Sequence, residues 1–371
     1  MRIGIPKEIK NHEYRVGLTP GSVQEICAHG HSVLVQTNAG IGIGASDADY
    51  KSAGATIIES AEEIFAKAEM IIKVKEPQAI ERAMLRKDQI LYTYLHLAPD
   101  PEQTKDLVNS GAVCIAYETV TSATGGLPLL APMSKVAGRL AVQAGAHCLE
   151  QPNGGLGKLL GGVPGVEPAK VVIIGAGVVG THAAHIAVGM GADVWVLDRN
   201  PVTLEQHWQQ FGDSTKTIYS TSNALEKHVL SADLVIGGVL IPGAEAPKLV
   251  TEEMVKKMKP GAVLVDVAID QGGCFATSHA TTHAEPTFVV DDVVHYCVAN
   301  MPGAVPRTST YALNNVTLPY ALALADKGYK QAMLDDEHLR NGLNVMHGHV
   351  TYKEVADKLG YTYKPALELL S

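Results

Sequence analysis

Long apolar runs are missing from this sequence of 371 residues, and cysteines are few. No uninterrupted stretch of about 18 apolar residues occurs, so a membrane-spanning helix is not expected. The opening segment MRIGIPKEIK has no apolar signal region and is typical of a first strand. The cysteines include no CxxC pair and are scattered at Cys27, Cys114, Cys148, Cys274 and Cys297. Five unpaired positions fit a reducing compartment better than a disulfide framework, so we expect a cytoplasmic protein.

An excess of positive charge is also missing. Lys and Arg number 30 against 39 Asp and Glu, and the resulting net charge of −9 argues against nucleic acid or anionic lipid as a partner. The sequence contains no internal repeat and no low-complexity segment. With 46% hydrophobic and 19% charged residues, it is typical of a soluble globular protein with room for two domains.

Short apolar runs alternate with helix-length amphipathic segments through the first 125 residues. The strands expected here are 2–5, 32–36, 56–58, 70–74, 89–96 and 113–117. The helices expected between them are 20–29, 60–68, 77–87 and 101–110. Alternation of this kind predicts βαβ units and a mainly parallel sheet.

A second series of the same kind follows an Ala-rich helical segment, 131–150, and a Gly- and Pro-rich loop, 151–170. Its expected strands are 170–174, 193–197, 216–219, 233–237, 262–266 and 287–290. Helices are expected again at 311–328 and 351–360, the latter with a capping box in TYKE (351–354) and an end at Gly360. We therefore predict an α/β protein with two doubly wound Rossmann-like domains, joined by two helical crossings, and a ligand-binding cleft between them.

The strongest motif is in residues 170–200, where Gly175, Gly177 and Gly180 form G-x-G-x-x-G between a buried strand and a helix. The first glycine permits the tight turn, the second lets a pyrophosphate approach the backbone, and the third lets the helix pack on the strand. Glycines gather in many turns, so the motif alone is weak evidence. Here the strand, the helix, a second strand and an acidic residue follow in the required order, which predicts a dinucleotide site.

Asp198 is that acidic residue, 18 positions beyond Gly180. A carboxylate at the end of the second strand accepts the ribose hydroxyls and repels a 2′-phosphate, which favours NAD over NADP. Arg199 is the complication, because an arginine here is able to pair with that phosphate.

The run ILYTYLHLAPD (90–100) raises the question of a histidine at the end of an apolar strand. Read with a period of two, Leu91, Thr93, Leu95 and Leu97 share one face, and Tyr92, Tyr94 and His96 share the other. A buried, hydrogen-bonded histidine is one interpretation of His96. The alternative is a proton-transferring group at the carboxyl end of the strand.

Two cations are candidates for the substrate side. Arg15 lies in the charged loop HEYRVGLTP, where its planar fork would suit a carboxylate. Lys75 follows the strand MIIKV and precedes Pro77. The alternative for each of them is a solvated surface charge. We do not interpret Lys73, two residues before Lys75 on the same face of the strand, as a site residue.

Asp270 ends the segment AVLVDVAID of the second series, near the place expected for a nicotinamide. We interpret Asp266, inside the strand, as structural. Cys274, His279 and His283 lie in a Ser/Thr-rich loop without a second Cys pair, so zinc is not expected. Nor is a metal expected at His182 and His185, which stand at i and i+3 on the cofactor helix, or in MHGH (346–349).

From end to end, the sequence resembles the alanine dehydrogenase family. Four stretches carry the resemblance: GIPKEIKNHEYRVGLTP (4–20), LYTYLHLA (91–98), VVIIGAGVVG (171–180) and NMPGAVPRTST (300–310). The resemblance implies reversible, NAD-dependent oxidative deamination of L-alanine to pyruvate and ammonia. It further implies a substrate domain of residues 1–130 and 306–371, an NAD-binding domain of residues 131–305, and a homohexamer.

Carried over position by position, the resemblance makes His96 the proton donor and acceptor and Asp270 its catalytic partner. It places Arg15 and Lys75 on the substrate. The positions that it places beside NAD, with the glycines of the motif, are Ser134, Val178, Val179, Asp198, Ser220, Val239, Leu240, Val267, Ala268, Ile269, Asp270, Val298, Ala299, Asn300 and Met301. A basic residue near the adenosine in some relatives is here Thr203 or His279, and the metal ligands of some relatives are here Ala323 and Lys327, so no metal is expected.

Three other functions stay open on the sequence. One is the NAD-binding subunit of a proton-pumping transhydrogenase, which would require a membrane partner and no amino-acid substrate. Another is an NAD-sensing protein without catalysis, and the third is an opine- or lysine-forming dehydrogenase. The presence of Arg15, Lys75, His96 and Asp270 together favours an amino-acid dehydrogenase.

Overall fold

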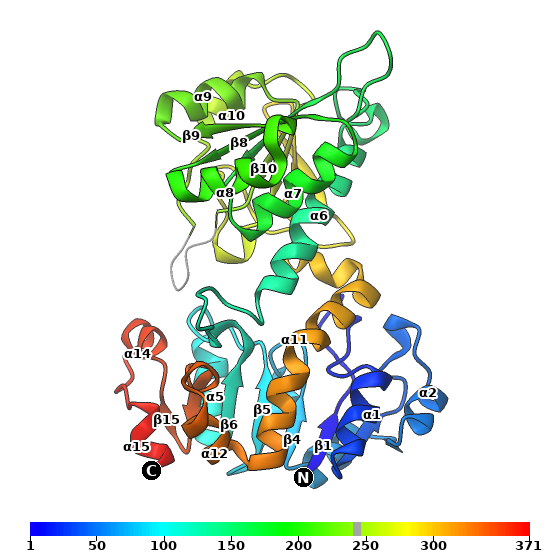
Figure 1. Ribbon diagram of the computed structural model, residues 1–371, viewed down its shortest axis with the longest axis vertical. Helices are drawn as coiled ribbons and strands as arrows, with labels where there is room; N and C mark the ends of the chain where they lie inside the picture. The colour runs from blue at the N-terminus through cyan, green and yellow to red at the C-terminus, as the bar shows by residue number, and fades with distance from the viewer. Residues whose placement is uncertain (240–245) are drawn as a thin grey trace. The chain divides into compact units, whose positions relative to one another are not determined.

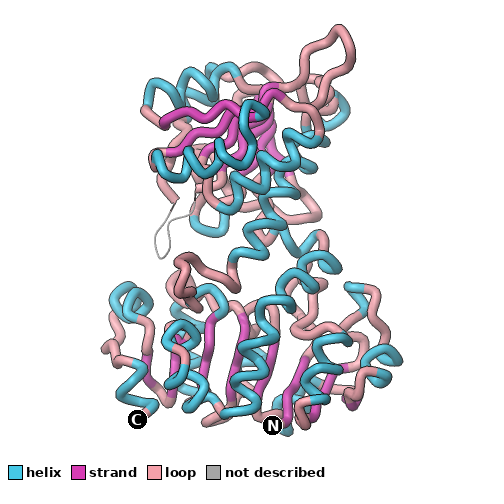
Figure 2. The backbone as a smooth tube through the Cα atoms, in the orientation of Figure 1, coloured by secondary structure: helices cyan, strands magenta, loops and turns pink. Residues whose placement is uncertain are grey.

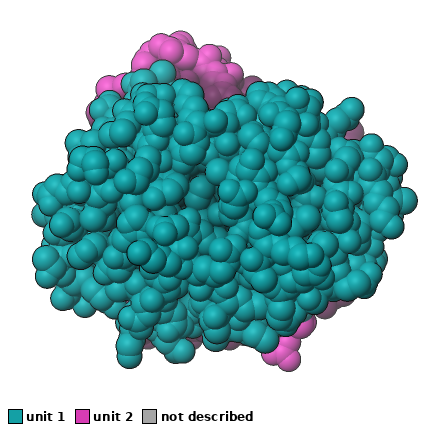
Figure 3. Space-filling model, turned by 90° about the horizontal axis from the view of Figure 1, so that it is seen from below, with its two compact units in different colours: residues 1–133, 305–371 teal, residues 134–304 magenta. Residues whose placement is uncertain are grey.

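Two α/β units make up the computed structural model, which describes residues 1–239 and 246–371. Unit 1 comprises Met1–Met133 and Val305–Ser371, and unit 2 comprises Ser134–Ala304 (Figure 3). The chain leaves unit 1 within helix α6 (Ala131–Cys148) and returns to it just before helix α11 (Pro306–Lys327). Each unit contains its own sheet, with helices on both faces (Figures 1 and 2).

The sheet of unit 1 has eight strands in the order β15-β14-β6-β5-β4-β1-β2-β3. Their bounds are β1 (Arg2–Ile5), β2 (Ser32–Gln36), β3 (Thr56–Ile58), β4 (Met70–Ile72), β5 (Ile90–Thr93), β6 (Val113–Ala116), β14 (Leu343–Met346) and β15 (His349–Val350). Strands β1 to β6 pair in parallel, and β14 is antiparallel to both β6 and β15. From β1 the chain winds outward through β2 and β3, and from β4 it winds the other way, so the sheet is doubly wound.

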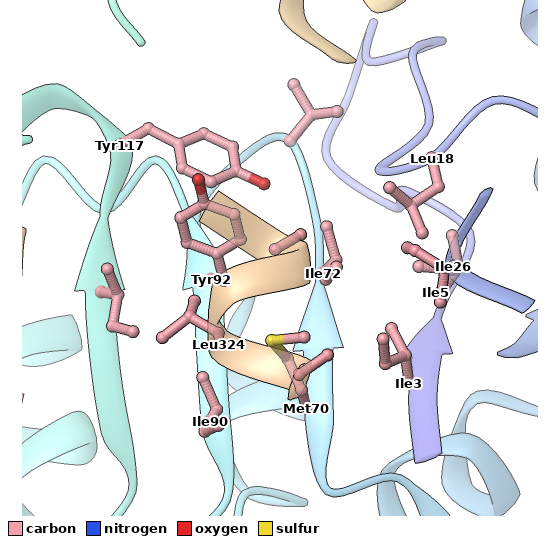
Figure 4. Close-up of a cluster of buried hydrophobic side chains, with 14 of the residues drawn as sticks. Ile3, Ile5, Leu18, Ile26, Met70, Ile72, Ile90, Tyr92, Tyr117 and Leu324 are labelled. Carbon is pink, nitrogen blue, oxygen red and sulfur yellow. The ribbon is translucent and has the colours of Figure 1, made fainter. Parts of the chain in front are cut away.

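Two hydrophobic cores cover the faces of this sheet, because side chains alternate along each strand. In β5, Ile90 and Tyr92 join the core that includes α1 (Pro20–Ala28) and α11, while Leu91 joins the core that includes α3 (Ala61–Lys67) and α5 (Pro101–Ser110). Figure 4 shows the first core, with Leu324 of α11 beside the side chains of β4 and β5. The remaining helices of unit 1 are α2 (Asp47–Ser52), α4 (Ala79–Arg82), α12 (Tyr329–Asp335), α13 (Glu337–Arg340), α14 (Lys353–Leu359) and α15 (Ala366–Leu370).

The described part of unit 2 forms a sheet in the order β12-β13-β11-β10-β7-β8-β9. The strands are β7 (Lys170–Ile174), β8 (Asp193–Asp198), β9 (Thr215–Tyr219), β10 (Leu234–Gly237), β11 (Val263–Asp266), β12 (Thr287–Val290) and β13 (Val293–Tyr296). The helices, besides α6, are α7 (Val178–Gly189), α8 (Pro201–Phe211), α9 (Ser222–Ser231) and α10 (Glu252–Lys257). Only β12 pairs antiparallel within this sheet, and the order reverses between β7 and β10, so unit 2 is doubly wound as well. The predicted α/β class with two mainly parallel sheets is confirmed.

Several predicted element bounds are wrong. The strand expected over 89–96 ends at Thr93, and the backbone N–H groups of Leu95 and His96 turn toward the side chain of Glu118. The helix expected over 77–87 is only Ala79–Arg82, since Arg86 and Gln89 beyond it bond to the end of α3. The helix expected from 311 begins at Pro306, whose fixed φ suits a first helical position.

The capping box expected at Thr351 and Glu354 is also wrong. The N-cap of α14 is Tyr352, which makes no capping side-chain bond, and the Thr351 hydroxyl donates to the carbonyl of Leu343 instead (2.8 Å). Gly360 ends this helix with φ +75°, as predicted. Strands β13, β14 and β15 were not predicted, because short strands leave too few residues for a period to be read.

His207 is a buried histidine on α8 with no hydrogen-bond partner for either ring nitrogen among the described residues. Its ring packs on Phe211 with the centroids 4.4 Å apart. Burial lowers the pKa of His207 below its ordinary value, because a charged imidazole loses its hydration there. The folded protein therefore binds fewer protons at this site than the unfolded chain as the pH falls through about 6.5.

We predict that His207→Phe makes unit 2 less sensitive to acid. The stability that the neutral imidazole contributes is fully present above the unfolded pKa and decreases as the pH falls below it, and phenylalanine cannot protonate. The thermal midpoint should fall by about 2 °C less between pH 7.5 and pH 5.5 than in the wild type. Tryptophan fluorescence reports on this unit, because both Trp195 and Trp208 belong to it.

His147→Phe is the control, since the side chain of His147 is 69% exposed. An equal acid-induced loss in the wild type and His207→Phe would mean that His207 does not contribute to acid sensitivity.

Candidate active site

Four neighbouring strands of unit 1, in the order β6-β5-β4-β1, are each followed by a charged or titratable side chain. Arg15 lies in the loop after β1, Lys75 follows β4, His96 follows β5, and Glu118 follows β6 in a 3-10 turn. Because these strands are parallel, their carboxyl ends lie on one edge of the sheet. The predicted residues Arg15, Lys75 and His96 thus share that edge with a carboxylate.

His96 is in the loop beyond β5, with a side chain that is 42% exposed. Its backbone N–H donates to Oε1 of Glu118 (2.6 Å), as does that of Leu95 (3.1 Å). Its φ of +50° is a left-handed conformation that is uncommon for a residue with a side chain. Nδ1 of the imidazole is 4.0 Å from the same carboxylate. Glu118 therefore holds the backbone at this strained position and faces the ring that it carries.

Tyr94 supports the imidazole from within unit 1. The two rings stack with the centroids 5.9 Å apart and the planes at 12°. Tyr94 is buried, its hydroxyl donates to the carbonyl of Leu129 (2.6 Å), and its ring meets Tyr117 edge-on at 5.0 Å. Since both ends of the tyrosine are held, the face of His96 lies against a fixed surface.

Lys75 is buried at the end of the segment that continues β4, and its carbonyl accepts a hydrogen bond from Thr93 of the next strand (3.0 Å). Glu76 follows it. Burial alone would raise the pKa of Glu76, but Lys75, Lys10 and His96 act together to bring it below its ordinary value. This effect puts Lys75 and His96 within electrostatic reach of one carboxylate.

Lys73 forms buried ion pairs that hold the backbone next to Lys75. Its ammonium pairs with two buried carboxylates, Glu8 (2.9 Å) and Glu81 (2.8 Å). The other oxygen of Glu8 accepts from the N–H of Val74 (2.7 Å) and of Lys75 (3.4 Å). The pair thereby fixes the segment that presents Lys75.

Arg15 is buried and already engaged by a neighbouring acid. Nε and Nη2 of its guanidinium donate to the two oxygens of Glu13 at 2.6 and 2.5 Å, and Nη1 contacts the sulfur of Met133 at 3.0 Å. The planar fork is thus held in one orientation by a bidentate pair.

In unit 2 the backbone of the glycine motif has the conformation and the space that were predicted for each of its three glycines. Gly175 has φ +100°, and a Cβ on Gly180 would lie 1.8 Å from the carbonyl oxygen of Gly175, so neither position accepts a side chain. A Cβ on Gly177 would meet nothing within 4 Å. Helix α7 begins directly after it, and the first turn of a helix has backbone N–H groups without intrahelical partners. The residues therefore fit a pyrophosphate at this turn.

Asp198 ends β8 and binds the glycine turn. Its Oδ2 accepts from the N–H of Ala176 (2.7 Å), and its Oδ1 accepts from the N–H of Asn200 (2.8 Å). Each carboxylate oxygen has a second lone pair, so the group is able to accept ribose hydroxyls as well.

The other residues expected beside NAD follow the parallel strands of the same sheet. Ser220 follows β9, Val239 follows β10, Val267–Asp270 follows β11, and Val298–Met301 follows β13. Ser134 lies on helix α6, and the exposed Val178 and buried Val179 begin helix α7. The two helices pack closely, since a Cβ on Gly138 of α6 would lie 2.2 Å from the carbonyl oxygen of Val179. Leu240 lies outside the described residues.

Asp270 is exposed on a 3-10 turn, Ile269–Gln271, that follows β11. Asp266 is fully buried at the end of that strand. The burial of Asp266 agrees with its interpretation as a structural residue, whereas Asp270 is accessible to solvent.

Cys274, His279 and His283 each have another partner. The thiol of Cys274 is buried, His279 stacks on Phe288 with the centroids 3.7 Å apart, and His283 contacts the carbonyl of Asn300 at 3.2 Å. Within the described ranges, none of the His, Cys, Asp and Glu side chains gather in threes with the geometry of a metal site. None of the helices in these ranges has the length and apolar character that a membrane span needs.

Comparison with known proteins identifies the family. The family model described as the N-terminal domain of alanine dehydrogenase/PNT matches residues 4–137, and the model of the C-terminal domain matches residues 141–353. The chain belongs to the alanine dehydrogenase/PNT family. Over its full length it is 59% identical to the alanine dehydrogenase of Halomonas elongata, covering all of that protein. It is 57% identical to that of Bacillus subtilis, covering 98% of it.

Solved structures extend the family comparison. An L-alanine dehydrogenase superposes with a TM-score of 0.93 at 50% identity, with 100% of both chains covered. A transhydrogenase from Sinorhizobium meliloti superposes with a TM-score of 0.83 at 26% identity, over 95% of this chain and 100% of that one. An L-alanine dehydrogenase and a transhydrogenase thus share the fold of this chain.

The carboxylates Glu8, Glu13 and Glu118 were missed by the sequence analysis, although Glu13 bonds the guanidinium of Arg15 and the other two accept the backbone N–H groups of Lys75 and His96. For Glu118 a signal was available, since it follows strand β6 as His96 follows β5 and parallel neighbours end together. Glu8 and Glu13 lie in the loop after β1, where spacing along the chain carries no information about which backbone groups they reach.

We predict that replacing Asp198 shifts cofactor preference from NAD toward NADP. Loss of the carboxylate removes its repulsion of a 2′-phosphate, and Arg199 next to it favours that phosphate. The ratio of kcat/KM for NADP to that for NAD should rise by about 10-fold or more in both Asp198→Ala and Asp198→Asn.

The asparagine variant removes the charge and keeps the bond to the glycine turn, because its amide oxygen is able to accept the N–H of Ala176 while its NH₂ group cannot accept that of Asn200. An unchanged ratio in both variants would refute the assignment of Asp198 to the ribose.

Proposed function

We propose that this protein catalyses the reversible, NAD-dependent oxidative deamination of L-alanine to pyruvate and ammonia. The observation that carries the proposal is the row of Arg15, Lys75, His96 and Glu118 at adjacent strand ends, in a chain whose full-length relatives are named alanine dehydrogenases. Unit 2 is the NAD-binding domain in this proposal, and unit 1 is the substrate domain.

The substrate carboxylate is assigned to Arg15. Glu13 holds the guanidinium in one orientation by a bidentate pair, which supports its use as a fixed cation for a carboxylate. Lys75 would polarise the substrate carbonyl or imine and stabilise the charge that develops on oxygen as the carbinolamine forms. Two cations for a carboxylate and a carbonyl oxygen suit a 2-oxo acid and the corresponding amino acid.

Proton transfer is assigned to His96. Bound NAD⁺ would supply the acceptor for the hydride that leaves Cα of alanine. Water must then add to the iminium and ammonia must leave, and each step moves a proton that an imidazole is able to accept and return near neutral pH. Glu118, facing Nδ1 at 4.0 Å, would stabilise the protonated ring and orient it.

Asp270 would orient the attacking water and stabilise the cationic iminium. Its exposure on the turn after β11 supports this role, because water and substrate are able to reach the carboxylate. An amide would fill the role poorly, since it has no negative charge.

We also propose a cytoplasmic location and a homohexamer, without a nucleic-acid or membrane partner. The five free thiols and the net charge of −9 support the location and the absence of nucleic acid. The hexamer rests on the family resemblance.

We predict that the purified protein alone reduces NAD⁺ with L-alanine and oxidises NADH with pyruvate and ammonium. Both directions are followed by absorbance at 340 nm against a panel of 2-amino, 2-oxo and 2-hydroxy acids. Alanine and pyruvate should give the highest kcat/KM, because the full-length relatives of this chain are named alanine dehydrogenases.

Good turnover of 2-hydroxy acids without turnover of any amino acid would refute the proposal. NADH binding without any turnover would favour a module like the transhydrogenase whose structure superposes on this chain.

We predict that His96→Ala lowers kcat by about 10²- to 10⁴-fold while NADH affinity, measured by fluorescence, stays near that of the wild type. His347→Ala is the matched control. His347 is also a left-handed histidine of unit 1, with φ +49° and an acidic partner, Asp88, at 2.7 Å. It should retain the wild-type kcat. A near-normal kcat in His96→Ala would contradict the assignment of proton transfer to His96 and favour a structural role for this residue.

A further inference from the structure

The loop that carries Asp270 leaves the sheet at Asp266 and returns to the same residue. Strand β11 ends at Asp266, the 3-10 turn Ile269–Gln271 follows, and the chain comes back to the Asp266 side chain at Cys274 and Phe275. Asp266 is 0% exposed, and the turn that contains Asp270 is the far part of the loop.

One carboxylate accepts four hydrogen bonds from the two ends of this loop. Oδ1 accepts the N–H of Ala268 (3.2 Å) and of Cys274 (3.1 Å). Oδ2 accepts the N–H of Phe275 (3.2 Å) and the hydroxyl of Ser278 (2.6 Å). Ala268 precedes the turn and the other three residues follow it, so the carboxylate closes the loop at its base.

Gly273 shows how closely the loop fits this carboxylate. Its φ is +80°, and a Cβ at this position would lie 2.6 Å from Oδ2 of Asp266. The loop is supported from the other side by the carbonyl of Gln271, which accepts from the N–H of Ala246 (2.9 Å), and by that of Gly272, which accepts from the ammonium of Lys248.

We propose that Asp266 is a positioning residue for Asp270: it fixes the loop so that the Asp270 carboxylate is in place before substrate binds. The inference rests on the proposed function of Asp270. It assigns to Asp266 an effect on the rate, in addition to any effect on folding, because a displacement of about 1 Å in a reacting group is able to cost about 10²-fold in rate.

A carboxylate is required at this position, since all four partners donate. An asparagine side chain of the same shape has one oxygen and one NH₂ group. Whichever way the amide is turned, its NH₂ faces at least one backbone N–H of Ala268, Cys274 or Phe275, and the loop must shift to relieve that contact.

The test is a double-mutant cycle in kcat with Asp266→Asn and Asp270→Asn, at saturating alanine and NAD⁺, on the full-length protein. Asp266→Asn should lower kcat by about 10- to 100-fold in the wild-type background. In the Asp270→Asn background it should change kcat by no more than about 2-fold, because the group that it positions has already lost its charge.

Asp233→Asn is the matched control for loss of a buried carboxylate in the same unit. Asp233 is 2% exposed and precedes β10, at the other end of a strand, where it accepts from Lys158 (2.7 Å), Lys259 (2.7 Å) and the N–H of Lys170 (2.8 Å). It should lower the thermal midpoint and leave kcat within about 2-fold of the wild type. If Asp266→Asn fails to fold, Ser278→Ala removes one donor and enters the same cycle, with an expected loss of about 2- to 5-fold in kcat.

A folded Asp266→Asn with kcat within 2-fold of the wild type would overturn the inference, and so would a full, multiplicative loss in the Asp270→Asn background. If Asp270→Asn itself kept the wild-type kcat, the assignment of Asp270 in the proposed function would fail, and the inference with it. That outcome is distinct, because it is read from the single variant alone.

Discussion

Parallel strand pairing is the constraint on which the candidate site depends. In a parallel sheet every strand ends at the same edge, so the pairing of strands brings side chains that are far apart in the sequence into one row. Arg15, Lys75, His96 and Glu118 form such a row in unit 1, over strands β1, β4, β5 and β6. In unit 2 the same rule collects the glycine turn, Asp198 and Asp270 at the ends of β7, β8 and β11. Chemistry is thereby confined to loops, while the strands form the two cores of each unit.

Loops after parallel strands carry backbone N–H groups that no neighbouring strand accepts, and leaving them unsatisfied when buried is costly. In four places a single carboxylate accepts two or more of the backbone N–H groups that follow these strands. The carboxylates and the N–H groups that they accept are Glu8 with Val74 and Lys75, Glu118 with Leu95 and His96, Asp198 with Ala176 and Asn200, and Asp266 with Ala268, Cys274 and Phe275. A carboxylate suits this task because it has about four lone-pair sites and no donor.

Prediction from the sequence succeeded where a period or a fixed spacing carried the information. Alternation along the predicted strand 89–96 predicted which face of the sheet Leu91, Tyr92 and Tyr94 would take. The glycine spacing predicted a turn that requires glycine at positions 175 and 180. It failed at the end of β5, because the strand stops at Thr93 and the N–H of His96 beyond it bonds to the carboxylate of Glu118, 22 residues further along the chain. It also failed for Glu8 and Glu13, whose partners are set by the three-dimensional path of a loop and not by any repeat.

These carboxylates also explain how an acidic protein can hold an anionic substrate. The acids at the strand ends of unit 1 are turned toward the backbone or toward a buried cation, as Glu13 is toward Arg15 and Glu8 toward Lys73, and do not form an open anionic surface. Removing a single partner from such a pair would leave a buried charge uncompensated, which is far more costly than losing a surface ion pair. Glu13 thus fixes the guanidinium of Arg15, and Glu8 fixes the backbone from which Lys75 extends. In the proposed function, recognition of a carboxylate would depend on the placement of these two cations, which is compatible with a net charge of −9.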